Sequence, residues 1–69
     1  MTDEAELRKR IDERGLKLKF IAGVCGLSYQ GFLNKLTNAS EFTASEILTL
    51  RELLGLSAED AEEIFFIRK

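Results

Sequence analysis

The sequence contains no histidine, tryptophan or proline, and it has a single cysteine, Cys25. One cysteine excludes a disulfide within the chain, and without histidine too few soft ligands remain for a structural zinc site. The lack of histidine also excludes the serine–histidine and cysteine–histidine pairs that activate nucleophiles. We therefore expect no metal, no cofactor, no small-molecule ligand and no enzymatic activity. Binding to a macromolecular partner is the favoured class of function.

Long apolar runs are missing as well, because no stretch approaches the roughly 18 residues that a membrane-spanning helix needs. Residues 1–4 are acidic rather than basic, unlike the start of a signal peptide. We therefore expect a cytoplasmic protein with no membrane partner. The 69 residues, 45% of them hydrophobic and 32% charged, fit one small globular domain. A chain this short buries only about 60% of the surface that its unfolded form exposes, so a partner chain would add stability.

Charge is spread unevenly along the chain, although the formal net charge is only −2. Residues 7–40 contain seven basic and two acidic residues, whereas residues 41–69 contain seven acidic and three basic ones. A basic middle segment on an acidic support fits a partner that carries negative charge. The alternative is ordinary solvated helix faces, and composition alone does not separate the two. Lys9, Arg10 and Arg14 are expected to act only as solubilising charge.

Capping signals and glycines divide the chain into five predicted helices, at residues 4–14, 18–25, 29–36, 44–54 and 58–66. Asp3 with Glu6, and Thr43 with Glu46, have the spacing of capping boxes. No segment alternates with the period of two that is typical of strands, and only residues 64–67 leave a short strand open as an alternative. The sequence thus predicts an all-α fold around one core.

Residues 18–36 have the spacing of a helix-turn-helix, in which two short helices are joined by a few residues that include a glycine. The small Ala22 allows the helices to approach, and Gly26 allows the left-handed backbone that ends the first helix. Phe32 then closes the pair from the other side. We expect Cys25 in the core as a small hydrophobe, together with the phenylalanines other than the terminal pair.

Four stretches of sequence carry a resemblance to a known family: residues 7–16, 20–28 (FIAGVCGLS), 32–38 (FLNKLTN) and 42–57. On these residues the chain resembles the phage Cro/CI-type repressors, the lambda-repressor-like or XRE family of helix-turn-helix regulators. The resemblance covers about residues 5–66. It implies a sequence-specific double-stranded DNA-binding transcriptional regulator, typically a prophage or mobile-element repressor that binds a near-palindromic operator as a homodimer.

The resemblance also assigns roles to residues, since in this family the second helix of the pair enters the major groove. The base contacts that it implies are Tyr29, Gln30 and Asn34. The contacts to the DNA backbone that it implies are Lys17, Lys19, Ser28, Lys35, Thr37 and Asn38. Gln30 and Asn34 carry the amides that suit adenine.

The carboxyl-terminal residues Phe65, Phe66 and Ile67 have more apolar surface than one side of a helix can bury. An exposed patch of this kind often marks an interface, so these residues are the expected dimer contact. Alternatively, Phe66 folds back onto the first helix. A second functional hypothesis also remains, in which the same fold is a protein-interaction module, an antirepressor or antitoxin-like adaptor that binds through Leu33 and its acidic half.

Overall fold

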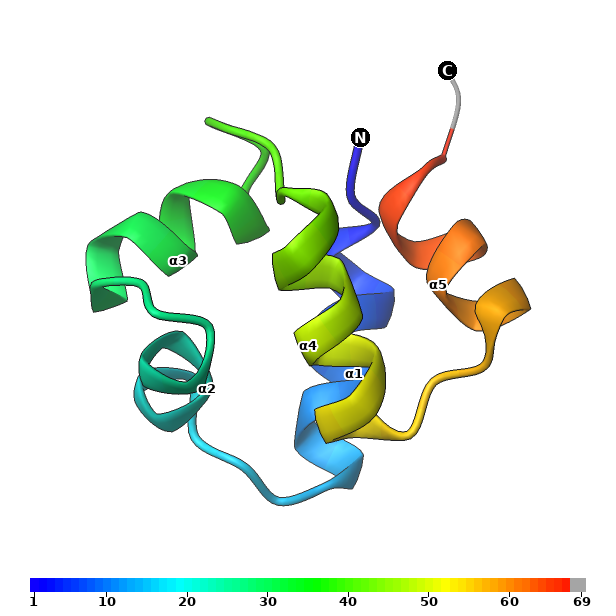
Figure 1. The fold of residues 1–69 in the computed structure, drawn as a ribbon, viewed down its shortest axis with the longest axis horizontal. Helices are drawn as coiled ribbons and strands as arrows, with labels where there is room; N and C mark the ends of the chain where they lie inside the picture. The colour runs from blue at the N-terminus through cyan, green and yellow to red at the C-terminus, as the bar shows by residue number, and fades with distance from the viewer. Residues whose placement is uncertain (68–69) are drawn as a thin grey trace.

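The computed structural model describes residues 1–67 and confirms the all-α fold (Figure 1). Its five helices are α1 (Glu4–Glu13), α2 (Leu18–Val24), α3 (Tyr29–Leu36), α4 (Ala44–Leu54) and α5 (Ala58–Phe65). Three of them end one residue earlier than predicted, at 13, 24 and 65. No strand forms within residues 1–67, because Ile64 and Phe65 belong to α5. None of these five helices is both long enough and apolar enough to cross a membrane.

The helix starts follow local capping chemistry. The side chains of Asp3, Ser28, Thr43 and Ser57 each accept a hydrogen bond from the backbone N–H three residues ahead. At α4 and α5 the bond is reciprocal, which makes two capping boxes. Helix α2 differs, since its N-cap residue Lys17 makes no side-chain capping bond. The amino end of α2 is therefore the one helix start of the described chain without such a cap.

The connection between α2 and α3 depends on Gly26, whose φ of +74° lies in the left-handed region that side chains disfavour. The amide of Leu27 then donates to the carbonyl of Ala22 at 2.9 Å, which closes the end of α2. Ala22 itself is buried, with 1% of its surface exposed. The small residue and the glycine thus stand where the spacing placed them, and α2 packs directly against α3.

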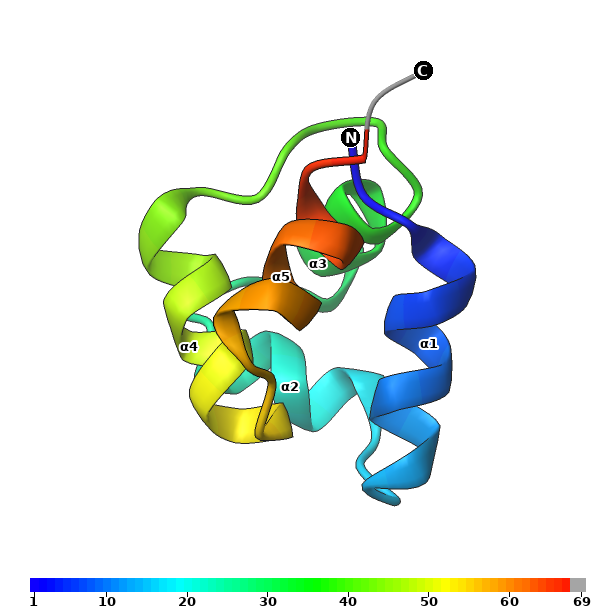
Figure 2. The same ribbon diagram turned by 90° about the vertical axis from the view of Figure 1, so that its right-hand side faces the viewer.

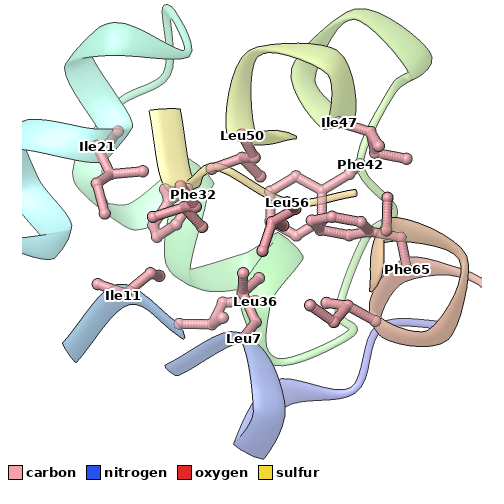
Figure 3. Packing of buried hydrophobic residues seen from close by; sticks show 14 residues of the cluster. Leu7, Ile11, Ile21, Phe32, Leu36, Phe42, Ile47, Leu50, Leu56 and Phe65 are labelled. Atoms are coloured by element: carbon pink, nitrogen blue, oxygen red, sulfur yellow. The ribbon is translucent and has the colours of Figure 1, made fainter. Parts of the chain in front are cut away.

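One core joins all five helices (Figure 3). Phe32 of α3 packs edge-to-face on Phe42, with ring centroids 5.8 Å apart, and Phe42 packs in the same way on Phe65 of α5 at 5.5 Å. The largest fully buried side chains are Phe32, Leu7, Ile21, Leu36, Leu50 and Ile64. Because Phe65 is only 3% exposed, it belongs to this core. This corrects the expectation that Phe65 forms part of a dimer contact.

The helices are arranged as two groups around that core. Helices α2 and α3 pack against each other on one side, whereas α5 packs on α1 and α4 on the other side (Figures 1 and 2). Two arginines expected to be only solubilising charge hold the second group together. Arg10 donates to Asp60 of α5 at 3.3 and 3.4 Å, and Arg14 Nε donates to the carbonyl of Leu54 at the end of α4. The solubilising-charge interpretation of these two residues is therefore wrong.

Candidate nucleic-acid interface

Helix α3 carries the three residues to which the resemblance assigns base contacts, and two of them lie on its outward side. Phe32 and Leu36 point into the core with none of their surface exposed, which turns the opposite side of the helix to solvent. Gln30 and Asn34 lie on this exposed side. Tyr29 is 44% exposed, but it precedes Leu36 by seven residues and so lies on the same face of the helix as Leu36, at its first turn. Amphipathic spacing alone produces this arrangement, because α3 has an apolar face and a polar face at the period of a helix.

Gln30 and Asn34 lie one turn apart on α3 and are bonded to each other. Gln30 Nε2 donates to Asn34 Oδ1 at 2.9 Å, and both side chains are exposed. The two amides therefore form one polar unit at the centre of the exposed face. Residues four apart on a helix are neighbours, so this contact was open to prediction from their spacing.

An open depression at the start of α3 brings three of the expected DNA contacts together. Its lining residues are Lys17, Leu18, Lys19 and Tyr29. Lys17 and Lys19 are exposed, and neither pairs with a carboxylate of residues 1–67. Two uncompensated positive charges thus lie next to the start of α3, near the phenol of Tyr29.

Ser28 is the N-cap of α3 and is exposed. Its hydroxyl accepts a hydrogen bond from the backbone N–H of Gly31 at 3.0 Å. A hydroxyl has one donor and two acceptor positions, so this cap leaves its donor available for an outside acceptor. Ser28 therefore remains compatible with the expected phosphate contact.

The three expected phosphate contacts at the other end of α3 are used within the chain. Lys35 Nζ donates to Glu46 of α4 at 2.5 Å, and the two side chains are only 15% and 13% exposed. The Thr37 hydroxyl donates to the carbonyl of Leu33 at 2.9 Å, which uses the only proton that it could offer to a phosphate. In this arrangement the Thr37 hydroxyl therefore cannot donate to a phosphate.

Asn38, the last of these three, holds the amino-terminal segment. Its side chain accepts from the Thr2 amide at 2.8 Å and donates to the Thr2 carbonyl at 2.9 Å. Its backbone has a φ of +69°, a conformation that asparagine tolerates better than most residues. We therefore place Lys35, Thr37 and Asn38 outside the candidate interface, which is defined by Lys17, Lys19, Ser28, Tyr29, Gln30 and Asn34.

The pairing of Lys35 also determines the charge of α3. Burial alone would raise the pKa of Glu46, but the hydrogen bonds from Lys35 and from the N–H of Thr43 outweigh it, so this pKa lies below its ordinary value. The carboxylate is therefore ionised near neutral pH and compensates Lys35. Since Lys35 is the one charged residue of α3, the exposed face of this helix is polar and neutral.

Cys25 lies at the end of α2 and is half-buried. The expectation that it lies deep in the core is therefore wrong. Burial, with a smaller contribution from Glu46, raises the pKa of its thiol. The thiol is therefore protonated near neutral pH, and only the thiolate is a good nucleophile.

An exposed apolar pair on α2 was not anticipated from the sequence. Phe20 is 54% exposed and Val24 is 45% exposed, and their spacing of four residues places them on one side of the helix. The prediction that Phe20 belongs to the core is wrong. The signal was present, because burying Ile21 and Ala22 turns positions 20 and 24 away from the core.

A second surface with apolar side chains lies between α4 and α5. Figure 2 views the molecule from the side on which these two helices lie. An open groove there is lined by Ile47, Arg51, Ala58, Ala61, Glu62 and Phe66. Phe66 is 57% exposed, so it does not fold back into the protein, and Leu48 of α4 is 52% exposed. The Nε of Arg51 is buried without a hydrogen-bond partner within residues 1–67.

Comparison of the chain with protein-family models, with curated proteins and with solved structures finds no match. Any functional assignment therefore depends on the geometry of the chain itself. Among residues 1–67, no group of three histidine, cysteine or acidic side chains is arranged to hold a metal ion.

Proposed function

We propose that this chain is a sequence-specific double-stranded DNA-binding protein, a transcriptional repressor of the lambda-repressor-like helix-turn-helix kind. In this proposal α3 enters the major groove and α2 crosses the phosphate backbone. The observation that carries the proposal is the placement of Lys17, Lys19 and Tyr29 around one open depression at the start of α3, the helix that also carries the exposed amides of Gln30 and Asn34. Cations would neutralise phosphates there while polar side chains face the bases.

The net charge of −2 does not favour DNA binding, but the uneven distribution of charge along the chain does. Phosphate binding depends on the cations that reach the backbone, and Lys17 and Lys19 have no carboxylate partner within residues 1–67. Because such an interface neutralises only a few phosphates, we expect modest affinity. The repressor would act by occupying promoter DNA.

One α3 would contact only a few base pairs, so useful specificity calls for two copies on a near-palindromic operator. Exposed Phe66, which lines the groove between α4 and α5, offers an apolar contact for a second copy. Arg51 and Glu62 line the same groove, so a second copy docked there about a twofold axis would meet one charge of each sign.

The proposal is tested by selecting binding sites from a random pool of double-stranded DNA at low salt. The full chain is used, and circular dichroism checks that it is folded. We expect enrichment of an inverted repeat whose half-sites lie about 34 Å apart along the duplex. A folded Lys17→Ala/Lys19→Ala variant serves as the matched control and should lose affinity for every sequence alike. A folded wild-type chain that enriches no sequence contradicts the proposal.

The second candidate function is the protein-interaction module, and the exposure of Phe20 and Val24 favours it. An apolar pair on a helix surface can bind a partner protein. Alanine at Gln30 and Asn34 separates the two functions, since it should abolish DNA sequence preference and leave protein binding unchanged. The opposite result, with function lost only on changing Phe20, Leu33 or Phe66, supports the interaction module.

A further inference from the structure

The outer face of α2, formed by Phe20, Gly23 and Val24, has a composition that the fold itself does not require. Phe20 is 54% exposed and Val24 is 45% exposed, and Gly23 is exposed as well. Helix α2 lies at the edge of the fold, so this face is turned to solvent (Figure 1). Neighbouring apolar side chains that stay in water often mark an interface.

Gly23 is the most informative residue of this face, because nothing inside the chain calls for a glycine there. The glycines with positive φ are Gly15, Gly26 and Gly55, so Gly23 does not serve a left-handed turn. A Cβ at position 23 would meet nothing within 4 Å beyond its chain neighbours and the backbone of its own helix. Glycine inside a helix is less stable than alanine. A close approach from outside the chain is the reason that remains.

The shape of this face fits a second helix. The distance between two packed helices depends on the side chains at the contact, and a glycine lets the partner's backbone come close. Phe20 and Val24 lie one turn apart and would pack against apolar residues at the same spacing on the partner. Because α2 has seven residues, the contact covers about two helical turns.

The charges beside this face determine the charge of the partner. Lys17 and Lys19 are exposed, and neither pairs with a carboxylate of residues 1–67. Lys17 precedes Phe20 by three residues and Lys19 precedes Gly23 by four, so both lysines are neighbours of the outer face. The sequence has no acidic residue between positions 14 and 40. A partner helix that carries carboxylates beside its apolar residues is therefore the complementary one.

We propose that the outer face of α2 docks an acidic amphipathic helix of a partner protein, and that this helix excludes DNA from Lys17 and Lys19. The docking stands on the residues of α2 alone, whereas the exclusion of DNA rests on the proposed DNA-binding function. The two lysines cannot contact phosphates and partner carboxylates at the same time. A phosphate backbone offers little apolar surface to Phe20 and Val24, so the protein partner uses more of this face than DNA does.

The experiment selects binders of the folded full chain from a library of random peptides. We expect enriched peptides in which acidic residues accompany apolar residues four apart. A selected peptide should bind the Phe20→Ser variant about tenfold more weakly than the wild type. Its affinity for the wild type should fall as the salt concentration rises. Leu48→Ser is the matched control and should keep the affinity, because Leu48 is similarly exposed, at 52%, but lies on α4.

Gly23→Ala separates docking from folding. The alanine should raise the melting temperature, because it favours the helix and has room for its methyl group. The same methyl group should weaken binding of the selected peptide several-fold, because it holds the partner's backbone away from α2. A variant that is more stable and yet binds less cannot owe its loss of binding to unfolding.

The outcomes of these measurements are distinguishable. Acidic peptides that depend on Phe20 and Gly23, and that displace a selected labelled duplex, support the proposal. It is overturned if no peptide is enriched, if the enriched peptides lack acidic residues, if they bind Phe20→Ser and Gly23→Ala as tightly as the wild type, or if they bind together with DNA. If the folded wild type selects no duplex, the proposed DNA-binding function fails, and dependence on Phe20 and Gly23 alone then decides whether a partner docks on α2.

Discussion

The basic region of the chain, residues 17–38, and the acidic region, residues 41–67, use their charges in opposite ways. The basic region has three lysines and no carboxylate, and two of the lysines have no partner within residues 1–67. The acidic region has seven carboxylates and one arginine. Several of these carboxylates close capping boxes or hold cations, as Glu46 and Asp60 do. Glu46 and Asp60 of the acidic region thus contribute to folding, whereas Lys17 and Lys19 of the basic region have no carboxylate partner within residues 1–67.

Asp60 shows how one carboxylate of the acidic region stabilises the fold through contacts near it. The backbone N–H of Ser57 and the guanidinium of Arg10 both donate to its carboxylate, and together they lower its pKa. One side chain therefore caps α5 and ties it to α1. A formal net charge of −2 says little about the surface near α3, because many of the negative charges are engaged far from it.

The largest expected effect comes from removing the aromatic ring that joins the two regions. Phe32→Ala takes a fully buried side chain from the core and should lower the free energy of unfolding by about 3–5 kcal/mol. That loss is comparable to the whole stability of a domain this small. Urea or thermal unfolding followed by circular dichroism measures it. Phe20→Ala makes the same change at an exposed position and should shift stability by less than about 0.5 kcal/mol; equal effects would contradict the assigned core.

The next effect tests the ion pair that neutralises α3. Glu46→Gln leaves the largely buried Lys35 without a carboxylate and should lower the free energy of unfolding at pH 7 by about 1–3 kcal/mol. The pKa of Glu46 is lowered by folding, so its contribution is present above the usual carboxyl value of about 4.3 and is lost as the pH falls through the lowered pKa. Wild type and variant should therefore converge in acid.

Urea unfolding at several pH values between neutral and acid follows this convergence. Glu52→Gln, an exposed change on the same helix, is the matched control and should change stability little. A difference between wild type and Glu46→Gln that stays constant down to strongly acid pH would contradict the assigned role of this pair.

A smaller effect is expected from the unpaired cations of the basic region. If Lys17 and Lys19 each neutralise a phosphate, the Lys17→Ala/Lys19→Ala variant should reduce the slope of log affinity against log salt by about 2. Titrations of labelled duplex at several salt concentrations give that slope. Lys9→Ala removes one exposed lysine of α1 and should leave the slope unchanged. An unchanged slope in the double variant would show that Lys17 and Lys19 do not contact the DNA backbone.

The smallest effect on folding is expected at the exposed end of the acidic region. Phe66→Ser should change the stability of the monomer by less than about 0.5 kcal/mol, because the ring is mostly in water. It should nevertheless weaken self-association if this surface binds a second copy. Sedimentation over a range of concentrations tests this, with Phe20→Ser as the control on the other apolar surface. Weaker association in the control alone would move the contact to α2.

The features that were predictable from the sequence are the local ones. Thr43 with Glu46 marks the start of α4 because a capping box needs only residues three apart, and Gly26 marks the turn before α3 for a similar reason. The bonds that remove Lys35 and Asn38 from the interface join residues 11 and 36 positions apart. No periodicity encodes such bonds, since they depend on how helices meet. The exposed amides of α3 were predictable as positions, because the spacing of Phe32 and Leu36 turns Gln30 and Asn34 outward.

The bonds of Thr2 have a consequence for the motions of the molecule. Thr2 is 5% exposed and is held by Asn38, while the neighbouring Met1 carbonyl and Asp3 amide bond to Ile67 and Ile64. Chain ends usually fray, so their amide hydrogens exchange with solvent quickly. Here the first residues should exchange slowly, together with those that close α3 and α5. The amide of Thr2 would then report on the opening of the whole fold.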